Sequence, residues 1–345
     1  MNGAITLAAA AACLLSAAIA PPLRRLALRW DLTDRPGGHK AHHHPTPYLG
    51  GIAIVLSTVV PTAVVLGLSD RRITVILLAA TAVAALGLID DVASLPVVTR
   101  LTVESVAAGG VVLSGVHITL TQTWVDKPIT VMWIVLMTNS FNLLDNMDGA
   151  LGTVGTVTAA FLGGAALVNS QQSFAVLLGA LAFACLGFLA HNWPPAKIFM
   201  GDTGSLFIGF VLTCSAIVLV AGQSVVMTVA GLLLWTFVAV VDTVVVLVSR
   251  IRAGRSPLSG GTDHVSHRLR RVGLGARTVP ATLGMITALP GALCLAVALS
   301  WIPPLTAAIV VGGIATILIS LLQGVSVYPP AQPLENLPKI TERRR

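Results

Sequence analysis

The stretch "ITVILLAATAVAALGLIDD" (73–91) is almost wholly apolar up to Ile89 and then carries two adjacent carboxylates, Asp90 and Asp91. An apolar run of this length is typical of a helix that crosses a bilayer, which needs about 20 residues. Two neighbouring acids disfavour each other's ionisation. The stretch therefore predicts a membrane helix with a functional group at its end.

The composition of the whole chain supports a membrane protein. The 345 residues are 55% hydrophobic and 10% charged, with a mean hydropathy of +0.88. Soluble domains carry about 25% charged residues, and a transmembrane barrel would show short alternating strands instead of continuous runs. We predict an all-α integral membrane protein with about eleven transmembrane helices. The expected spans are 4–20, 50–68, 73–89, 103–120, 129–144, 150–168, 173–190, 204–221, 224–248, 279–299 and 301–323.

The positive charges predict the orientation. Eleven spans place 18 of the 21 Lys and Arg residues on one side, which the positive-inside rule makes cytoplasmic. The N-terminus is then outside, and the first span, which lacks a basic leader, is a retained helix. We expect residues 1–323 to form a single polytopic domain in the cell membrane of a bacterium. Residues 324–345 would be a basic, disordered cytoplasmic tail.

Five segments with reactive side chains fall on the predicted cytoplasmic face. Each alone has an ordinary explanation, because acids often mark helix ends and a histidine run is more often a solvated loop than a zinc cage. Together they predict an active site built from cytoplasmic loops. The segments are "DLTDRPGGHKAHHHPTPYLGG" (31–51), Asp90–Asp91 with Arg100, "NSFNLLDNMDGA" (139–150), "HNWPPAKIFMGDTGSL" (191–206) and "RIRAGRSPLSGGTDHVSHRLRR" (250–271).

The residue types in these segments indicate the chemistry. Oxygen ligands without thiolates suit Mg²⁺, with Mn²⁺ as an alternative, and Mg²⁺ commonly binds one or two carboxylates together with substrate phosphates. Arginine, lysine and histidine nearby suit a diphosphate. We predict magnesium-assisted phosphoryl chemistry at the membrane boundary, with one substrate from water, one from lipid and no nucleic-acid partner.

The motifs resemble those of the polyprenyl-phosphate N-acetylhexosamine-1-phosphate transferases over residues 31–271. "DDVASL", "NSFNLLDNMDG", "NWPPAKIFMGDTGSL" and "DHVSHRL" follow one another in the family's order. The resemblance implies transfer of N-acetylhexosamine-1-phosphate, in the first place GlcNAc-1-phosphate, from a UDP-sugar to undecaprenyl or decaprenyl phosphate. UMP is released, and the reaction begins a cell-envelope glycan. The chain departs from the family pattern at Arg100, Glu104, Asn146, Ala150 and Ser266, the last standing where a histidine is usual.

The resemblance also assigns roles to individual residues, carried over position by position. Catalytic roles fall to Asp90, Asp91, Asp145, Asp148, His264 and His267. Asp202, together with Asp145, would hold the metal. Substrate binding would involve Lys40, His42, Thr46, Asn139, Asn142, Asn192 and Arg268. A homodimer is also compatible with the family.

Several alternatives stay open at this point. The nearest is a phospho-MurNAc-pentapeptide transferase, although the short "DHVSHRL" loop fits the GlcNAc branch better. A secondary transporter would place ionisable groups near the bilayer midplane, and a lipid-binding scaffold would need only the basic loops. For the reaction, direct attack by the lipid phosphate, which is largely dianionic at pH 7, competes with a covalent intermediate on an aspartate.

Overall fold

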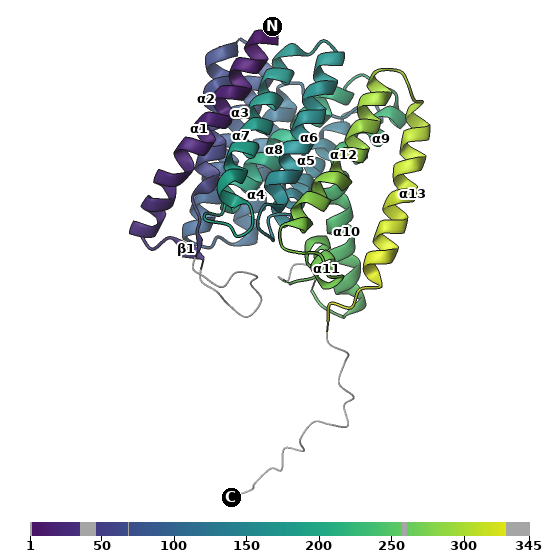
Figure 1. Ribbon diagram of the computed structural model, residues 1–345. Coiled ribbons are helices and arrows are strands. Elements are labelled where there is room, and N and C mark those ends of the chain that lie inside the picture. The colour runs from purple at the N-terminus through teal and green to yellow at the C-terminus, as the bar shows by residue number, and fades with distance from the viewer. Residues whose placement is uncertain (1, 35–45, 68, 257–260, 329–345) are drawn as a thin grey trace, which may run out of the picture.

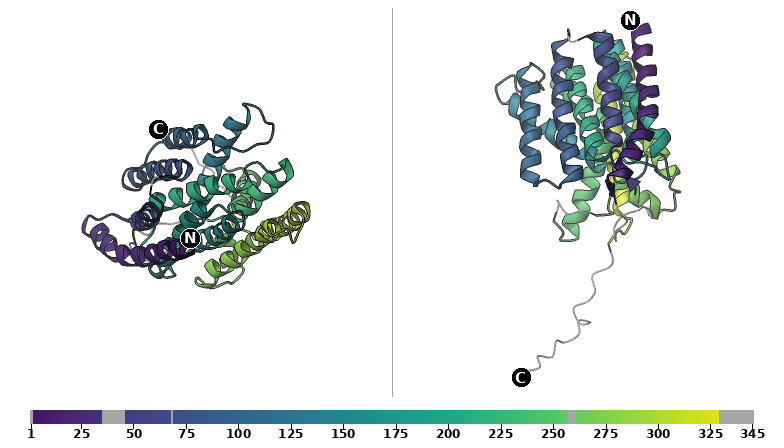
Figure 2. Two further views of the ribbon diagram at one scale, coloured as in Figure 1. Left: turned by 90° about the horizontal axis from the view of Figure 1, so that it is seen from above. Right: turned by 90° about the vertical axis from the view of Figure 1, so that its left-hand side faces the viewer.

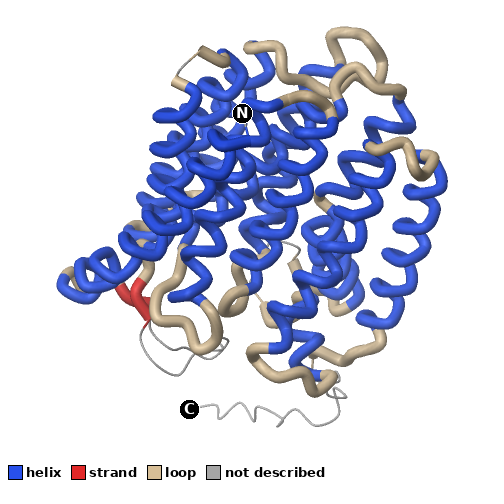
Figure 3. Tube along the Cα trace, turned by 45° about the horizontal axis from the view of Figure 1, so that its top comes forward, coloured by secondary structure: helices blue, strands red, loops and turns tan. Residues whose placement is uncertain are grey.

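The structure is a bundle of long helices with one small hairpin (Figures 1 and 3). It is a computed structural model that describes residues 2–34, 46–67, 69–256 and 261–328. The elements, in chain order, are α1 (Asn2–Arg29), β1 (Thr33–Asp34), β2 (Thr46–Pro47), α2 (Gly50–Leu66), α3 (Arg71–Val92), α4 (Val97–Leu113), α5 (Asp126–Leu143), α6 (Ala150–Val168), α7 (Gln172–Asn192), α8 (Gly201–Val220), α9 (Val225–Trp235), α10 (Phe237–Arg252), α11 (Val265–Arg271), α12 (Thr278–Ala298) and α13 (Pro304–Gln323).

The predicted fold class is confirmed, because each predicted span overlaps a helix or, in one case, a pair of helices. Within the described ranges, seven helices are long and apolar enough to cross a membrane, and the bent pair α9–α10 counts as an eighth if it forms one span. The protein is therefore a multi-pass membrane protein. The count of eleven and the orientation stay predictions.

The predicted span 103–120 is shifted in the structure. α4 begins right after Pro96 and ends at Leu113. Two charged side chains, Arg100 and Glu104, lower the hydropathy of its first turns, but both are paired inside the bundle, with Asp90 and Asn139. Paired charges can enter a membrane helix at much lower cost than single ones.

The predicted span 224–248 is also different, because it consists of two helices. α9 and α10 meet at Thr236 and are bent by 75°. The Thr236 hydroxyl donates to the carbonyl of Leu232 at 2.7 Å, which satisfies one of the acceptors at the end of α9. The bend directs α10 toward the end of the bundle that carries α11 (Figure 1).

α8 forms the core of the bundle, because every residue from Thr203 to Val220 is buried. Glycines allow its first turn to approach its neighbours closely. A Cβ added to Gly51 of α2 would lie 2.3 Å from the backbone nitrogen of Gly204, and one added to Gly87 of α3 would lie 2.5 Å from the backbone of Asp202. The two helices are thus in backbone contact with the start of α8.

The strands β1 and β2 hold the described part of the first motif next to the start of α8. β1 and β2 pair antiparallel, and the Phe199 amide donates to the carbonyl of Pro47 at 2.9 Å. The amides of Gly50 and Gly51 donate in turn to the carbonyls of Phe199 and Met200, each at 2.9 Å. The hairpin and α11 therefore lie at the end of the bundle opposite the N-terminus (Figures 1 and 2).

Replacing Gly51 with Ala should lower the free energy of unfolding by about 1–3 kcal/mol or more, the usual cost of overpacking, because backbone atoms of α8 cannot move aside. Thermal unfolding of the purified protein in detergent measures this. Gly110→Ala in α4 is the matched control, since a Cβ there meets nothing within 4 Å. Equal midpoints for the two variants would contradict the close contact.

Candidate active site

Asp91 binds the start of α8. Its Oδ1 accepts the amide N–H of Asp202 at 2.8 Å, and its Oδ2 accepts the amide and the hydroxyl of Thr203 at 3.2 and 2.8 Å. A carboxylate at a helix N-terminus satisfies free N–H groups and favours the helix dipole. Gly201, at φ +64°, leaves the necessary room, because a Cβ there would lie 2.5 Å from Asp91 Oδ2.

Asp90 faces different partners from Asp91. Its Oδ1 accepts the amide of Leu95 at 2.6 Å, and its Oδ2 forms an ion pair with Nη1 of Arg100 at 2.6 Å. The same Nη1 lies 3.4 Å from Oδ2 of Asp202. The adjacent acids therefore serve different groups, and one arginine offsets the charge of both Asp90 and Asp202.

Asp202 is the meeting point of four helices. Besides Arg100 of α4, its carboxylate accepts a hydrogen bond from Asn142 Nδ2 of α5 at 2.9 Å. The same amide nitrogen donates to Ser205 Oγ at 2.8 Å. Asn139, one turn earlier, bonds Glu104 instead. The structure thus brings Asp90, Asp91, Asn142 and Asp202 together, as the motifs predict.

Asp145, between α5 and α6, is the unpaired acid of the site. Within the described ranges its carboxylate has no hydrogen-bond partner, and burial, followed by the charges of Asp202, Asp91 and Asp148, raises its pKa well above the ordinary value. These carboxylates would be stabilised by a cation. The described residues hold no group of three or more His, Cys, Asp or Glu side chains placed as a complete metal site. A site of one or two carboxylates completed by substrate phosphates is what Mg²⁺ prefers, so Asp145 and Asp202 fit it.

Two further predicted residues fix the loops around Asp145. The buried side chain of Asn192 accepts the amide of Gly149 and donates to the carbonyl of Ile198, both at 3.0 Å. Asp148 accepts the amide of Ala196 at 2.9 Å. Both side chains therefore join the α5–α6 loop to the "NWPPAKIFMG" loop.

The histidines are positioned by an acid of α10. Nδ1 of His264 donates to Asp242 Oδ2 at 2.7 Å, and the Val265 amide donates to Oδ1 at 2.7 Å. Since an ionised carboxylate only accepts hydrogen bonds, the proton sits on Nδ1 and Nε2 is left for a ligand. The rings of His264 and His267 lie 6.3 Å apart. Burial, followed by the charge of His264, lowers the pKa of His267 to about 4, so this ring is neutral at pH 7.

Two departures from the family pattern contact each other. The hydroxyl of Ser266 donates to Oδ1 of Asn146, which ties α11 to the α5–α6 loop that carries Asp145. Arg268 does not reach this group of side chains. It is buried, and its guanidinium donates to backbone carbonyls of Asp263, Leu322 and Val325.

The first motif is only partly described. Lys40 and His42 lie outside the described residues. Thr46 is buried in β2, where it pairs with Asp34.

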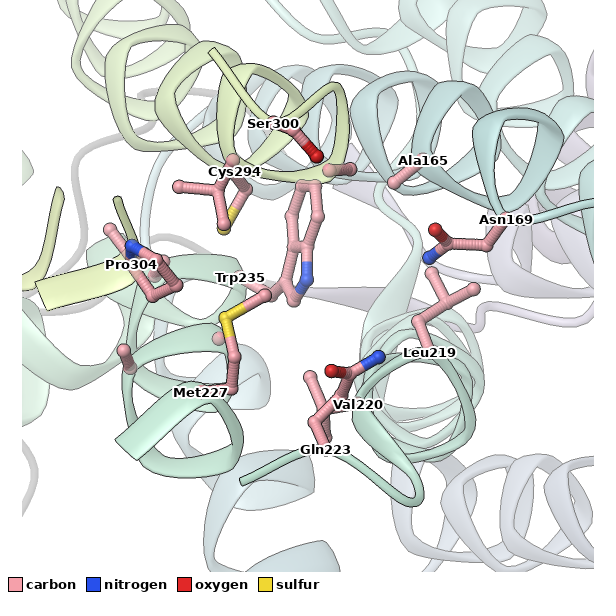
Figure 4. Close-up of a pocket in the computed structure, with 15 residues that line it drawn as sticks. Ala165, Asn169, Leu219, Val220, Gln223, Met227, Trp235, Cys294, Ser300 and Pro304 are labelled. Carbon is pink, nitrogen blue, oxygen red and sulfur yellow. The ribbon is translucent and has the colours of Figure 1, made fainter. Parts of the chain in front are cut away.

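A separate cavity of about 230 Å³ lies at the other end of α8 (Figure 4). Val220, Trp235 and Cys294 are among its lining residues, and the ring of Trp235 projects into it (Figure 4). It contains none of the predicted site residues that the structure describes, and those around Asp202 lie at the opposite end of α8.

Asp242, the residue that orients His264, is not among the residues with a predicted role. The sequence does indicate a role for Asp242, because an ionisable residue inside an apolar span is by default a functional candidate. Arg250 and Tyr328, which bind Asp263 next to His264, carried no such signal.

The family follows from comparison with known proteins. The family model of glycosyl transferase family 4 matches residues 73–220, which include Asp90, Asp91, Asp145 and Asp202. Together with the relatives described next, this match shows that the chain belongs to glycosyl transferase family 4, a family of membrane enzymes that includes polyprenyl-phosphate GlcNAc-1-phosphate transferases. The predicted resemblance is confirmed.

Three relatives illustrate the similarity. A Streptomyces coelicolor protein assigned as a glycosyltransferase is 41% identical, covering 95% of this chain and 78% of its own. A Bacillus subtilis protein assigned as an undecaprenyl-phosphate N-acetylglucosaminyl 1-phosphate transferase is 30% identical, covering 75% of each chain. The decaprenyl-phosphate N-acetylglucosaminephosphotransferase of Mycobacterium tuberculosis is 30% identical, covering 90% and 87%.

Replacing Asn192 with Ala should lower the free energy of unfolding by about 2–4 kcal/mol, because two buried backbone groups lose their partner at about 1–3 kcal/mol each. Thermal unfolding in detergent tests this. The control is Asn169→Ala, an exposed amide at the opposite end of the bundle, with an expected change within about 0.5 kcal/mol. A small loss for Asn192→Ala would mean that the two loops are held by other contacts.

Proposed function

We propose that this protein transfers N-acetylglucosamine-1-phosphate from UDP-N-acetylglucosamine to a polyprenyl phosphate and releases UMP. The observation that carries the proposal is the Asp145 carboxylate, which has no hydrogen-bond partner among the described residues and feels the charge of Asp202. The next residue, Asn146, bonds Ser266 of the histidine helix. The named activities of the Bacillus and Mycobacterium relatives support the same substrates.

Each group of residues in the site has a different proposed role. Asp145 and Asp202 would hold Mg²⁺, which, when bound, neutralises the diphosphate and polarises its phosphorus–oxygen bonds. His264, when its Nε2 is protonated as well as its Nδ1, would donate from Nε2 to the diphosphate oxygens that gain charge as UMP leaves. The neutral ring of His267 would donate from its one protonated nitrogen. Arg100, whose side chain is 22% exposed, is near enough to the surface to attract the lipid phosphate.

The hydrogen bonds of the paired acids support direct attack by the lipid phosphate. Both oxygens of Asp90 accept hydrogen bonds, one from Leu95 and one from Arg100. Both oxygens of Asp91 are bound to the start of α8. A carboxylate nucleophile needs a free oxygen aimed at phosphorus, so we assign both acids to positioning.

The test is an assay with purified protein, undecaprenyl or decaprenyl phosphate, and a panel of UDP-sugars. We expect UMP release and a sugar-diphospho-lipid with UDP-GlcNAc, and none with UDP-MurNAc-pentapeptide. UMP release without lipid, or a phospho-sugar bound to an aspartate, would contradict direct attack. Full activity after removal of all divalent cations would contradict the metal site.

Asp145→Asn should lower turnover by about 100-fold or more at low Mg²⁺, because a metal ligand worth several kcal/mol in the transition state is lost. Raising the Mg²⁺ or Mn²⁺ concentration should recover part of the activity, as a Mg²⁺ titration measures. The control is Asp70→Asn, which changes an acid that caps α3 at its other end. An unchanged Mg²⁺ dependence would remove Asp145 from the metal site.

The site should face the cytoplasm. Ser69 and Ser94 are exposed and lie just before and just after α3, so they are on opposite sides of the membrane if α3 spans it. In a Cys13→Ala background, where the other three native cysteines are buried, Ser69→Cys should react with an impermeant thiol reagent in intact cells. Ser94→Cys should react only after lysis. The reverse pattern would invert the orientation.

A further inference from the structure

The helix that carries the histidine motif cannot be stable by itself. α11 has seven residues, and its last turn contains three arginines. Isolated helices shorter than about 12 residues are marginal even with favourable sequences. Its position must therefore come from contacts with other elements, and Asp242 supplies the contact at its N-terminus.

A second anchor binds Asp263, the residue before His264. The Asp263 carboxylate is fully buried and accepts two hydrogen bonds from Arg250, at 2.9 and 3.1 Å. A third comes from the hydroxyl of Tyr328 at 2.7 Å. Burial alone would raise the pKa of Asp263, but these hydrogen bonds and the charge of Arg250 outweigh burial and lower it, so the group stays ionised.

A third anchor lies on the far side of α11. The buried guanidinium of Arg268 donates to the carbonyl of Asp263 at 2.9 Å and to those of Leu322 and Val325 at 2.6 and 2.8 Å. Arg271 donates to the carbonyl of Ser326 at 2.6 Å. Carbonyls at the end of α13 and just beyond it are thus satisfied by α11, a favourable place for cations.

The second and third anchors share one segment of the chain, whereas Asp242 of the first belongs to α10. Tyr328, Val325 and Ser326 belong to the segment Gln323–Tyr328, which begins at the end of α13 and crosses over to α11. Among the described residues, Tyr328 is the one side chain outside α10 that bonds the Asp263 carboxylate. Asp242 bonds the imidazole of His264, while Arg250 and Tyr328 hold the residue just before it, so the position of the ring depends on both sets of contacts.

We propose that the segment Gln323–Tyr328 positions His264 for the transfer reaction, with Tyr328 as the positioning residue that acts through Asp263. The proposal rests on the proposed function, since His264 matters only if it contacts the diphosphate. It also gives a function to residues that the sequence suggested were part of a disordered tail.

Tyr328→Phe tests the proposal, because it removes one hydroxyl and keeps the ring. We expect faster hydrogen exchange of the α11 amides and a kcat lower by about 3- to 10-fold, the scale of one hydrogen bond, with KM for UDP-GlcNAc nearly unchanged. The control is Thr316→Val, which removes an exposed hydroxyl of α13 that donates to the Gly312 carbonyl and leaves both Asp263 and the segment Gln323–Tyr328 untouched. It should match the wild type in both measurements.

A double-mutant cycle separates positioning from general stabilisation. If Tyr328 acts through His264, Tyr328→Phe should cause no further loss of kcat in a His264→Ala background. The same fold-loss in both backgrounds would overturn the proposal, and so would unchanged exchange of α11 in Tyr328→Phe. Hydrogen exchange needs no substrate, so a wild-type protein inactive toward UDP-GlcNAc would contradict the proposed function while the exchange result still decides the anchor.

Discussion

The hydrogen bonds from the start of α8 to Asp91 are the interaction on which the site depends. α8 is buried along almost its whole length, and its free amide groups would be left unsatisfied at the membrane boundary without an acceptor. Asp91 supplies that acceptor and so fixes the end of α3 against Asp202. Once these two elements are joined, Asp90 points at Arg100, and Arg100 reaches Asp202. One acid of the pair is structural, and this allows the other to take part in a charge network.

Charge balance explains the rest of the site. Most polar side chains here have partners, with Asp90 on Arg100, Asp263 on Arg250, and His264 on Asp242. Burying a charge is tolerable only when it is paired and hydrogen-bonded. Among the described residues, the Asp145 carboxylate has no such partner. A cation bound together with the substrate would offset the unfavourable free energy of burying its charge.

The sequence predicted the positions of most helices well, because a helix in lipid must satisfy its own backbone and present a continuous apolar run. The sequence-based prediction was wrong where a residue's hydrogen-bond partner is distant in the chain. The start of α4 was missed because Glu104 bonds Asn139, 35 residues away. The predicted site residues that the structure describes lie together at one end of the bundle, since the loops alternate. The roles of individual residues were harder to predict, because Asp91 bonds an amide 111 residues later and Arg268 bonds carbonyls 54 and 57 residues later.

The anchoring of α11 by residues beyond α13 has a consequence for biosynthesis. A ribosome makes Asp90, Asp91, Asp145 and Asp202 early, and these acids can meet as soon as α8 is inserted. His264 follows, but Leu322, Val325 and Tyr328 emerge only after about 60 more residues. A nascent chain that stops before α13 therefore has its acids in place and its histidine helix unanchored. Assembly of the site is completed only after α13 and the segment that follows it have been translated.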